Sequence, residues 1–102
     1  MISAKENDDK QSLLMTSSNY YLQLTLRAGY VDFGHCRLLI KLLRIKNENM
    51  IRALEDYFVN GGARKDICAR HCVSQGYLSV KIKQLQQINR IIFLLLPYYL
   101  KY

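Results

Sequence analysis

Basic, amide and hydroxyl side chains gather between residues 63 and 84 of this 102-residue chain. Arginine and lysine bind phosphate, and a glutamine amide can make two hydrogen bonds to one base edge. The candidate contact residues are Arg64, Lys65, Arg70, Gln75, Gly76, Tyr77, Ser79, Lys81, Lys83 and Gln84. These residue types suit contact with double-stranded DNA, provided that the local fold presents them together.

The two basic residues at the start of this segment, Arg64 and Lys65, lie in the first turn of a predicted helix, residues 63–71. The free backbone N–H groups of a helix N-terminus favour phosphate, as the two cationic side chains do. Gln75 opens the next predicted helix, and Gly76 allows a close approach of its backbone. In a helix-turn-helix, this end of the second helix meets the base edges.

Further along the second helix, Tyr77, Lys81 and Gln84 recur at i, i+4 and i+7 and therefore share one face. Lys83 and Arg70 flank that face and are predicted to bind phosphate. Basic side chains on a helix also serve simply to solvate it, and Tyr77 also fits the role of a half-buried hydrophobic contact.

The segment from about residue 63 to residue 84 also fits the packing that a helix-turn-helix requires. The first helix needs a small residue where the two axes approach, and apolar anchors must lie around the turn and on the inner face of the second helix. The residues that meet these needs are Ile67, Cys68, Val73, Leu78 and Ile82. Two positions fit less well: His71 stands where an apolar residue is common, and Cys72 where glycine is common.

The charge of the chain is uneven. Lys and Arg number 15 against 8 Asp and Glu, which gives a net charge of +7. Residues 35–102 carry 12 basic and 4 acidic side chains, or +8, so residues 1–34 carry −1. A basic body of this size favours a polyanionic partner.

Hydrophobic periodicity predicts a mainly α protein, a small helical bundle with a mobile N-terminal tail at residues 1–19. Residues 20–27 alternate between apolar and polar, which is compatible with one short strand that would need a partner, and residues 20–34 form the strand and a linker. The helical DNA-binding domain is predicted at residues 35–102. Its helices are expected at 36–46, 48–60, 63–71 and from 74 to about 96, with Asn47 and Ser74 as N-caps, Gly61 and Gly62 ending the second, and Pro97 stopping or kinking the last.

Two apolar features raise questions of packing. The stripe on the first helix is broad, so most of this helix is expected to be buried, and Arg37, Lys41 and Arg44 form the narrow remainder. We interpret that basic stripe as a solvated face rather than a second DNA contact. The apolar run Ile91–Leu96 either folds back on the core of its own chain or mediates self-association.

The sequence contains no apolar run of 18 residues, so a membrane span is not expected. The polar N-terminus lacks the apolar region of a secretory signal, and the cysteine count of three is odd. A cytoplasmic, nucleoid-associated protein with reduced thiols is the expectation.

The stretch from His35 to Tyr99 resembles the adhesin (fimbrial) biosynthesis regulators of the PapB type. The matching pieces are "LLI" at 38–40, "ALEDYFVNGGARKDIC" at 53–68, "GYLS" at 76–79 and "LPYY" at 96–99. This resemblance implies a transcriptional regulator of a bacterial fimbrial operon, which binds AT-rich promoter DNA as a homo-oligomer occupying adjacent sites.

In that family, the residues that match Arg64 and Cys68 are tied to DNA binding. Arg64 suits direct contact, whereas Cys68 is better placed to set the packing of the two helices. The family also favours the minor groove, which would weaken base reading in the major groove by Gln75 and Tyr77. Arg37 and Lys41 depart from the family pattern, because neutral residues are expected there.

Other functional classes fit the sequence less well. It contains no glycine-rich phosphate loop, no Ser-His-Asp set and no carboxylate pair in apolar surroundings, so neither an enzyme nor a small-molecule substrate is expected. Cys68, His71 and Cys72 follow one another at helical spacing, but structural zinc usually uses a cysteine pair across a knuckle and not on a helix that faces the core, so we predict no metal and no cofactor. The main alternative is a basic helical module that binds another protein without contacting DNA.

Overall fold

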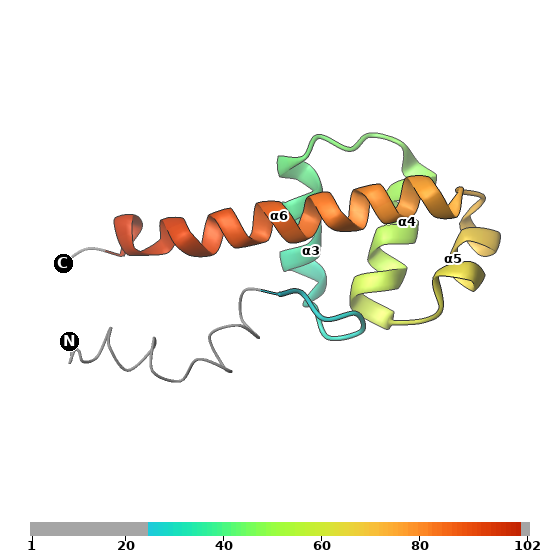
Figure 1. The fold of residues 1–102 in the computed structure, drawn as a ribbon, viewed down its shortest axis with the longest axis horizontal. Helices are drawn as coiled ribbons and strands as arrows, with labels where there is room; N and C mark the ends of the chain where they lie inside the picture. The colour runs from blue at the N-terminus through green and yellow to red at the C-terminus, as the bar shows by residue number, and fades with distance from the viewer. Residues whose placement is uncertain (1–24, 101–102) are drawn as a thin grey trace.

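The computed structural model describes residues 25–100, which form a bundle of helices (Figure 1). The elements are α3 (Phe33–Leu42), α4 (Glu48–Glu55), the π-helix η1 (Asp56–Asn60), α5 (Arg64–His71) and α6 (Gln75–Tyr99). Residues 25–100 contain no strand, so the mainly α prediction is confirmed for them. The predicted tail and residues 20–24 of the predicted strand lie outside the described residues.

Three helices begin at side chains that accept a hydrogen bond from the first turn. Asn47 Oδ1 accepts from the N–H of Met50 at 2.9 Å, and Ser74 Oγ accepts from the N–H of Tyr77 at 3.1 Å, as the sequence predicts. Asp32 does the same for α3. Each cap satisfies a backbone donor that the helix itself leaves free.

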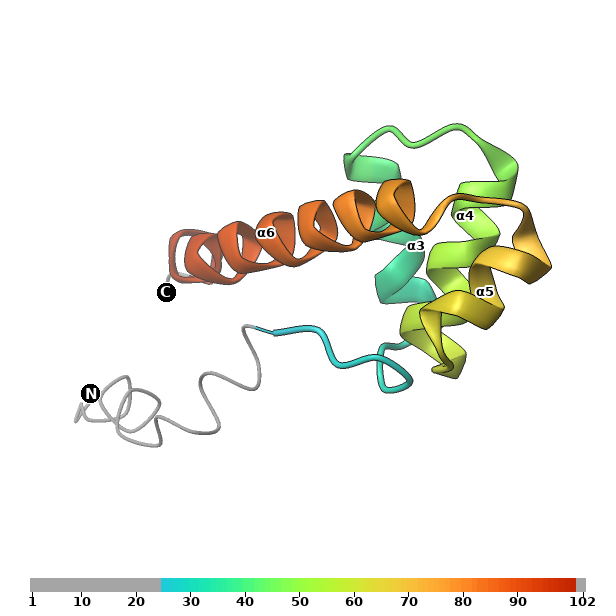
Figure 2. The same ribbon diagram turned by 45° about the vertical axis from the view of Figure 1, so that its right-hand side comes forward.

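The core lies where α6 crosses the other helices (Figures 1 and 2). The largest fully buried side chains are Cys36, Leu39, Met50, Leu54, Phe58, Ile67, Leu78 and Leu85. They come from each of the five elements named above, so one hydrophobic cluster joins the helices of residues 25–100. Burying a side chain such as Leu or Phe stabilises a fold by about 1.5–3 kcal/mol.

Helix α3 corrects the prediction for the first helix in both its bounds and its burial. It begins three residues earlier than expected, because Asp32 caps it, and it ends at Leu42 rather than residue 46. Leu38 and Leu42 are 65% and 56% exposed, so the expected burial of most of this helix is wrong. Its inner stripe, around Leu39, packs on the core, while Leu38 and Leu42 on the opposite face are left exposed by the helices of residues 25–100.

The end of α3 also breaks the predicted basic stripe. Arg44 adopts a left-handed conformation with φ of 59°. Its N–H donates to the carbonyl of Lys41 at 3.0 Å, and the N–H of Ile45 donates to the carbonyl of Ile40 at 3.3 Å. This pair of hydrogen bonds is a Schellman motif, which terminates a helix and turns the chain away. Arg44 therefore lies in the connection to α4 and not on α3.

The second predicted helix, 48–60, consists of two parts. α4 passes directly into η1, where Gly61 N–H donates to Asp56 carbonyl at 3.0 Å, a bond that spans five residues. Gly61 then ends the element with φ of 78°, as its residue type predicts. The widened turn at η1 carries Asp56, whose contacts are described below.

The segment before α3 is fixed to the bundle by an amide side chain. Gln86 Nε2 donates to the carbonyl of Leu26, and Gln86 Oε1 accepts from the N–H of Leu26, both at 2.8 Å. One side chain thus satisfies the backbone groups that a neighbouring strand would satisfy. Gly29 then lies against Gly61 so closely that a Cβ on Gly61 would be 3.1 Å from the Cα of Gly29.

The last helix, α6, runs well past the bundle (Figures 1 and 2). It continues to Tyr99 with Pro97 inside it, so the expected stop near Leu96 is wrong by about one turn. Proline lacks only its own N–H, and the N–H of Leu100 still donates to the carbonyl of Leu96 at 2.9 Å. No helix among residues 25–100 is long and apolar enough to cross a membrane.

Candidate nucleic-acid interface

The connection between α5 and α6 is a tight turn with a defined backbone shape. Cys72 is left-handed, with φ of 58° and ψ of 46°, and the N–H of Val73 donates to the carbonyl of Cys68 at 3.1 Å. Glycine is common at this position because it adopts such a conformation without the steric cost that a Cβ brings. Cys72 therefore adopts a left-handed conformation that is unfavourable for a residue with a Cβ.

The five residues predicted to pack α5 against α6 are buried or half-buried. Ile67 and Leu78 are fully buried, Cys68 and Ile82 are nearly so, and Val73 is half-buried against the same cluster. These five side chains fix the relative orientation of α5 and α6, and hence the surface that α6 presents.

The outer face of α6 carries most of the predicted contact residues. Gln75, Gly76, Tyr77 and Lys83 are exposed, while Ser79, Lys81 and Gln84 are half-buried. A Cβ on Gly76 would meet nothing within 4 Å, so packing does not require glycine there.

Two residues of this face escaped the sequence reasoning. Val80, one turn beyond Gly76, is 51% exposed, and Gln87, three turns beyond Gly76 on the same side of the helix, is exposed as well. The signal that would have found them is the spacing of four and eleven residues from Gly76, which places all three on one face. An exposed valine amid polar residues is a candidate contact for an apolar group.

Arg64 links the two helices. Its Nη1 donates to Ser79 Oγ at 3.2 Å, and its guanidinium lies 5.5 Å from the centre of the Tyr57 ring. Only one of the five guanidinium donors is used on Ser79, so the group is held in place with other donors free. Lys65 beside it is exposed and has no ion pair in the described part of the chain.

Lys81 is held on the flank of α6 that faces away from Ser79. Its Nζ donates to Gln84 Oε1 at 3.2 Å and lies 5.4 Å from the centre of the Tyr77 ring. The predicted row of Tyr77, Lys81 and Gln84 is therefore a connected set of side chains.

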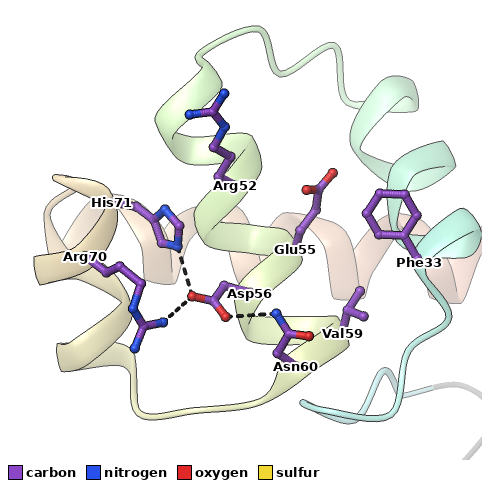
Figure 3. Close-up of a pocket in the computed structure, with 8 residues that line it drawn as sticks. All are labelled: Phe33, Arg52, Glu55, Asp56, Val59, Asn60, Arg70 and His71. Atoms are coloured by element: carbon purple, nitrogen blue, oxygen red, sulfur yellow. Dashed lines mark hydrogen bonds and ion pairs between the residues drawn. The ribbon is translucent and has the colours of Figure 1, made fainter.

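Arg70 lies apart from the outer face of α6. Its guanidinium pairs with the carboxylate of Asp56 in η1, which also accepts from His71 Nε2 at 2.9 Å and from Asn60 Nδ2 at 3.1 Å (Figure 3). Burial alone would raise the pKa of Asp56, but the hydrogen bonds from His71, Asn60 and Arg70 outweigh it and lower that pKa below its usual value. The network fastens α5 to η1 and explains the polar residue at position 71.

The electrostatics of α6 are one-sided. Asp66 is the last acidic residue of the sequence, so α6 contains Lys81, Lys83 and Arg90 and no carboxylate. In the region from residue 25 to residue 100, Lys83 forms no ion pair. Such a surface attracts polyanions over a distance of about 8 Å at physiological salt.

The cysteines do not form a metal site within the described residues, where no group of three or more His, Cys, Asp or Glu side chains is placed to hold an ion. Cys36 and Cys68 are buried and Cys72 is exposed. Burial, aided by the Glu55 carboxylate and opposed by Arg37, raises the pKa of the Cys36 thiol to about 11, so this residue acts as a small hydrophobic side chain.

Known proteins of similar sequence and fold are bacterial regulators. The chain matches the family model of the adhesin biosynthesis transcription regulatory protein PapB over residues 6–99. It is 44% identical to the regulatory protein FanB of Escherichia coli over 93 residues, 91% of this chain and 88% of that protein. It is 31% identical to PapB, a regulatory protein of a major pilus subunit operon in Escherichia coli, over 85% of this chain and 88% of that protein. The crystal structure of Escherichia coli FocB covers 88% of this chain and 98% of its own, with a TM-score of 0.67 and 29% identity. The chain therefore belongs to the family of adhesin biosynthesis transcription regulatory proteins, which are not enzymes.

Proposed function

We propose that this protein regulates transcription of a fimbrial operon by binding promoter DNA through α5 and α6, which act as a helix-turn-helix. The observation that carries the proposal is the outer face of α6, which is exposed, free of carboxylates and positioned by a packed turn. In this arrangement Gln75 and Gly76 enter the groove, and Lys65 and Lys83 contact phosphates. Arg64, already fixed by Ser79, adds a phosphate contact at the start of α5.

The side chains of this face favour A·T base pairs. A glutamine amide pairs with the N6 and N7 edge of adenine, and an apolar side chain packs on the thymine methyl group in the major groove. Gln75, at the start of α6, and Val80, on its outer face, supply these two groups. This chemistry supports the AT-rich promoter that the family resemblance implies, and it favours the major groove.

The protein acts as an oligomer in this proposal, and its site of action is the cytoplasm, at the nucleoid. The end of α6 projects beyond the bundle (Figure 1) and supports an oligomer because its exposed side chains are apolar. Its exposed apolar residues are Ile91, Leu94, Leu95, Leu96, Tyr98, Tyr99 and Leu100. Soluble monomers rarely leave so large an apolar patch uncovered.

The alternative of a protein-binding module without DNA contact draws on a weaker observation. Such a module would expose apolar side chains on the outer face of the first half of α6. Val80 is exposed there, but it is surrounded by Gly76, Ser79, Lys83 and Gln84. A polar and basic surface around one valine suits DNA better than a protein groove.

The direct test is a footprint and a titration on AT-rich fimbrial promoter DNA at two or more salt concentrations. The wild-type affinity should fall steeply with salt, and Arg64→Ala should weaken binding and reduce the slope by about one unit. The helical content of Arg64→Ala should equal that of the wild type. Arg52→Ala is the matched control, because Arg52 is exposed on α4, pairs with Glu48 at 3.6 Å and lies off the outer face of α6.

A second arm of this test addresses the groove. Replacing thymine by uracil removes the methyl group and should weaken binding of the wild type but not of Val80→Ala. An affinity for promoter DNA that Arg64→Ala leaves untouched would contradict the proposed docking. If minor-groove ligands compete with the protein for promoter DNA and uracil has no effect, the protein contacts the minor groove instead.

A further inference from the structure

Three cations near the end of α3 have no partner in the structure of residues 25–100. Lys41, Arg44 and Lys46 are all exposed, and no carboxylate pairs with them. Two basic residues near them along the chain are engaged instead: Arg37 pairs with Glu55 at 3.3 Å, and Arg52 pairs with Glu48. Uncompensated charge within six residues of sequence repels itself and is best offset by an external anion.

The backbone at Arg44 supplies an independent observation. This residue holds a left-handed conformation in which glycine is favoured, yet it carries a long cationic side chain. A strained residue that the surrounding structure maintains is a marker of a functional position. The neighbouring Ile45 packs against the core and fixes the turn, so the direction of the connection is set.

The placement of this connection relates it to the proposed DNA surface. In Figures 1 and 2, the chain between α3 and α4 runs along one edge of the first half of α6, and the start of α5 lies along the other. The Arg64–Ser79 contact fixes which flank of α6 faces α5, and Lys81 lies on the other flank. The basic residues before α4 and those at the start of α5 therefore bracket α6.

We infer that Lys41, Arg44 and Lys46 form a second phosphate-binding edge, which contacts the DNA strand on the side of the groove opposite to Arg64 and Lys65. This inference rests on the proposed function and extends it: α6 occupies the groove, and a basic edge holds the backbone on either side. The sequence alone places Arg37, Lys41 and Arg44 on one helical stripe; the structure instead groups Lys41 and Arg44 with Lys46 and leaves Arg37 with Glu55.

The test measures the salt dependence of promoter binding for the full chain with Lys41→Gln, Arg44→Gln and Lys46→Gln combined. Each lost phosphate contact reduces the slope of log affinity against log salt by about 0.9, so the triple variant should lose about two to three units. Arg52→Gln serves as the control with the same charge change, and it should keep the wild-type slope.

The single variant Arg44→Gly separates the loss of a phosphate contact from a loss of stability. Glycine relieves the left-handed backbone, so the midpoint of thermal unfolding should stay the same or rise, while the slope falls by about one unit. A wild-type slope in the triple variant, with binding still lost in Arg64→Ala, would overturn the second edge and leave the proposed function standing. Absence of salt-dependent binding in the wild type would overturn both.

Discussion

At the scale of single residues, the carboxylate of Asp56 joins three other side chains. Its side chain is only 14% exposed and receives hydrogen bonds from Arg70, His71 and Asn60. Asp56→Asn removes the charge that these donors share, so we expect a loss of about 1–2 kcal/mol in the free energy of unfolding at pH 7. Urea unfolding followed by circular dichroism measures this loss.

The pH dependence of that loss follows from the lowered pKa of Asp56. A carboxyl group whose folded pKa is depressed stabilises the fold above its unfolded pKa, ordinarily 3.8, and this contribution disappears as the pH falls through the folded value. The difference in stability between the wild type and Asp56→Asn should therefore begin to shrink below about pH 4 and disappear only below the folded pKa of Asp56. A difference that stays constant down to pH 3 would show that the charge of Asp56 has no such role.

Sequence reasoning identified His71 as an anomaly but could not explain it. His71 is polar because its ring forms a hydrogen bond with Asp56, fifteen residues away on η1. The sequence does not show such a contact because it depends on how the helices pack. The same limit applies to Arg70, which the sequence treats as free and which Asp56 holds. By contrast, burial of Ile67, Cys68 and Leu78 followed from spacing within the motif, because helical periodicity is local.

At the scale of elements, two helix starts were predicted from their caps, whereas both the start of α3 after Asp32 and its end were missed. Asn47 and Ser74 cap their helices as expected, because a cap is a hydrogen bond between near neighbours. The end of α3 was missed, since a left-handed arginine at position 44 follows from tertiary packing of Ile45 and not from residue preference. The predicted stop at Pro97 was also wrong. Close to the last turn of a helix, a proline removes only one backbone hydrogen bond, so α6 continues to Tyr99.

The turn between α5 and α6 gives an element-scale prediction. Cys72 adopts φ of 58°, which costs a residue with a Cβ about 1–2 kcal/mol. Cys72→Gly should therefore raise the free energy of unfolding by about 0.5–1 kcal/mol, once the greater chain entropy of glycine is counted. Cys72→Ala is the matched control, because it removes the thiol and keeps the Cβ, and it should leave stability close to the wild type. Equal effects of both changes would assign the cost to the thiol instead.

At the scale of the whole molecule, the two ends of α6 have different surroundings. Its first half is packed on the bundle and polar outside. Its end projects beyond the bundle (Figure 2), and the side chains of its last two turns are apolar or aromatic. The sequence left open whether the run from Ile91 folds onto its own core. Ile92 does pack against the core, while Leu94, Leu95 and Leu96 are each more than a third exposed. The packed and the projecting part of the helix thus divide between DNA contact and self-association in the proposed function.

Self-association through this end predicts a specific change in mass. The wild type should sediment as a species heavier than the 12.0 kDa monomer, and the mass should rise with protein concentration. Leu95→Glu places a charge in the apolar surface and keeps a good helix former, so it should shift the protein towards the monomer. Because adjacent DNA sites are then filled independently, its binding curve on promoter DNA should also lose cooperativity.

Leu38→Glu on α3 is the control for this prediction, since Leu38 is 65% exposed on the bundle itself. If Leu38→Glu yields the monomer and Leu95→Glu does not, the exposed face of α3 is the interface and the end of α6 must be covered in another way. A mass of 12.0 kDa for the wild type at every concentration would remove the oligomer from the proposed function. The helix-turn-helix would then have to reach its affinity as a monomer, with the basic residues on either side of α6 supplying the phosphate contacts that a second copy would otherwise add.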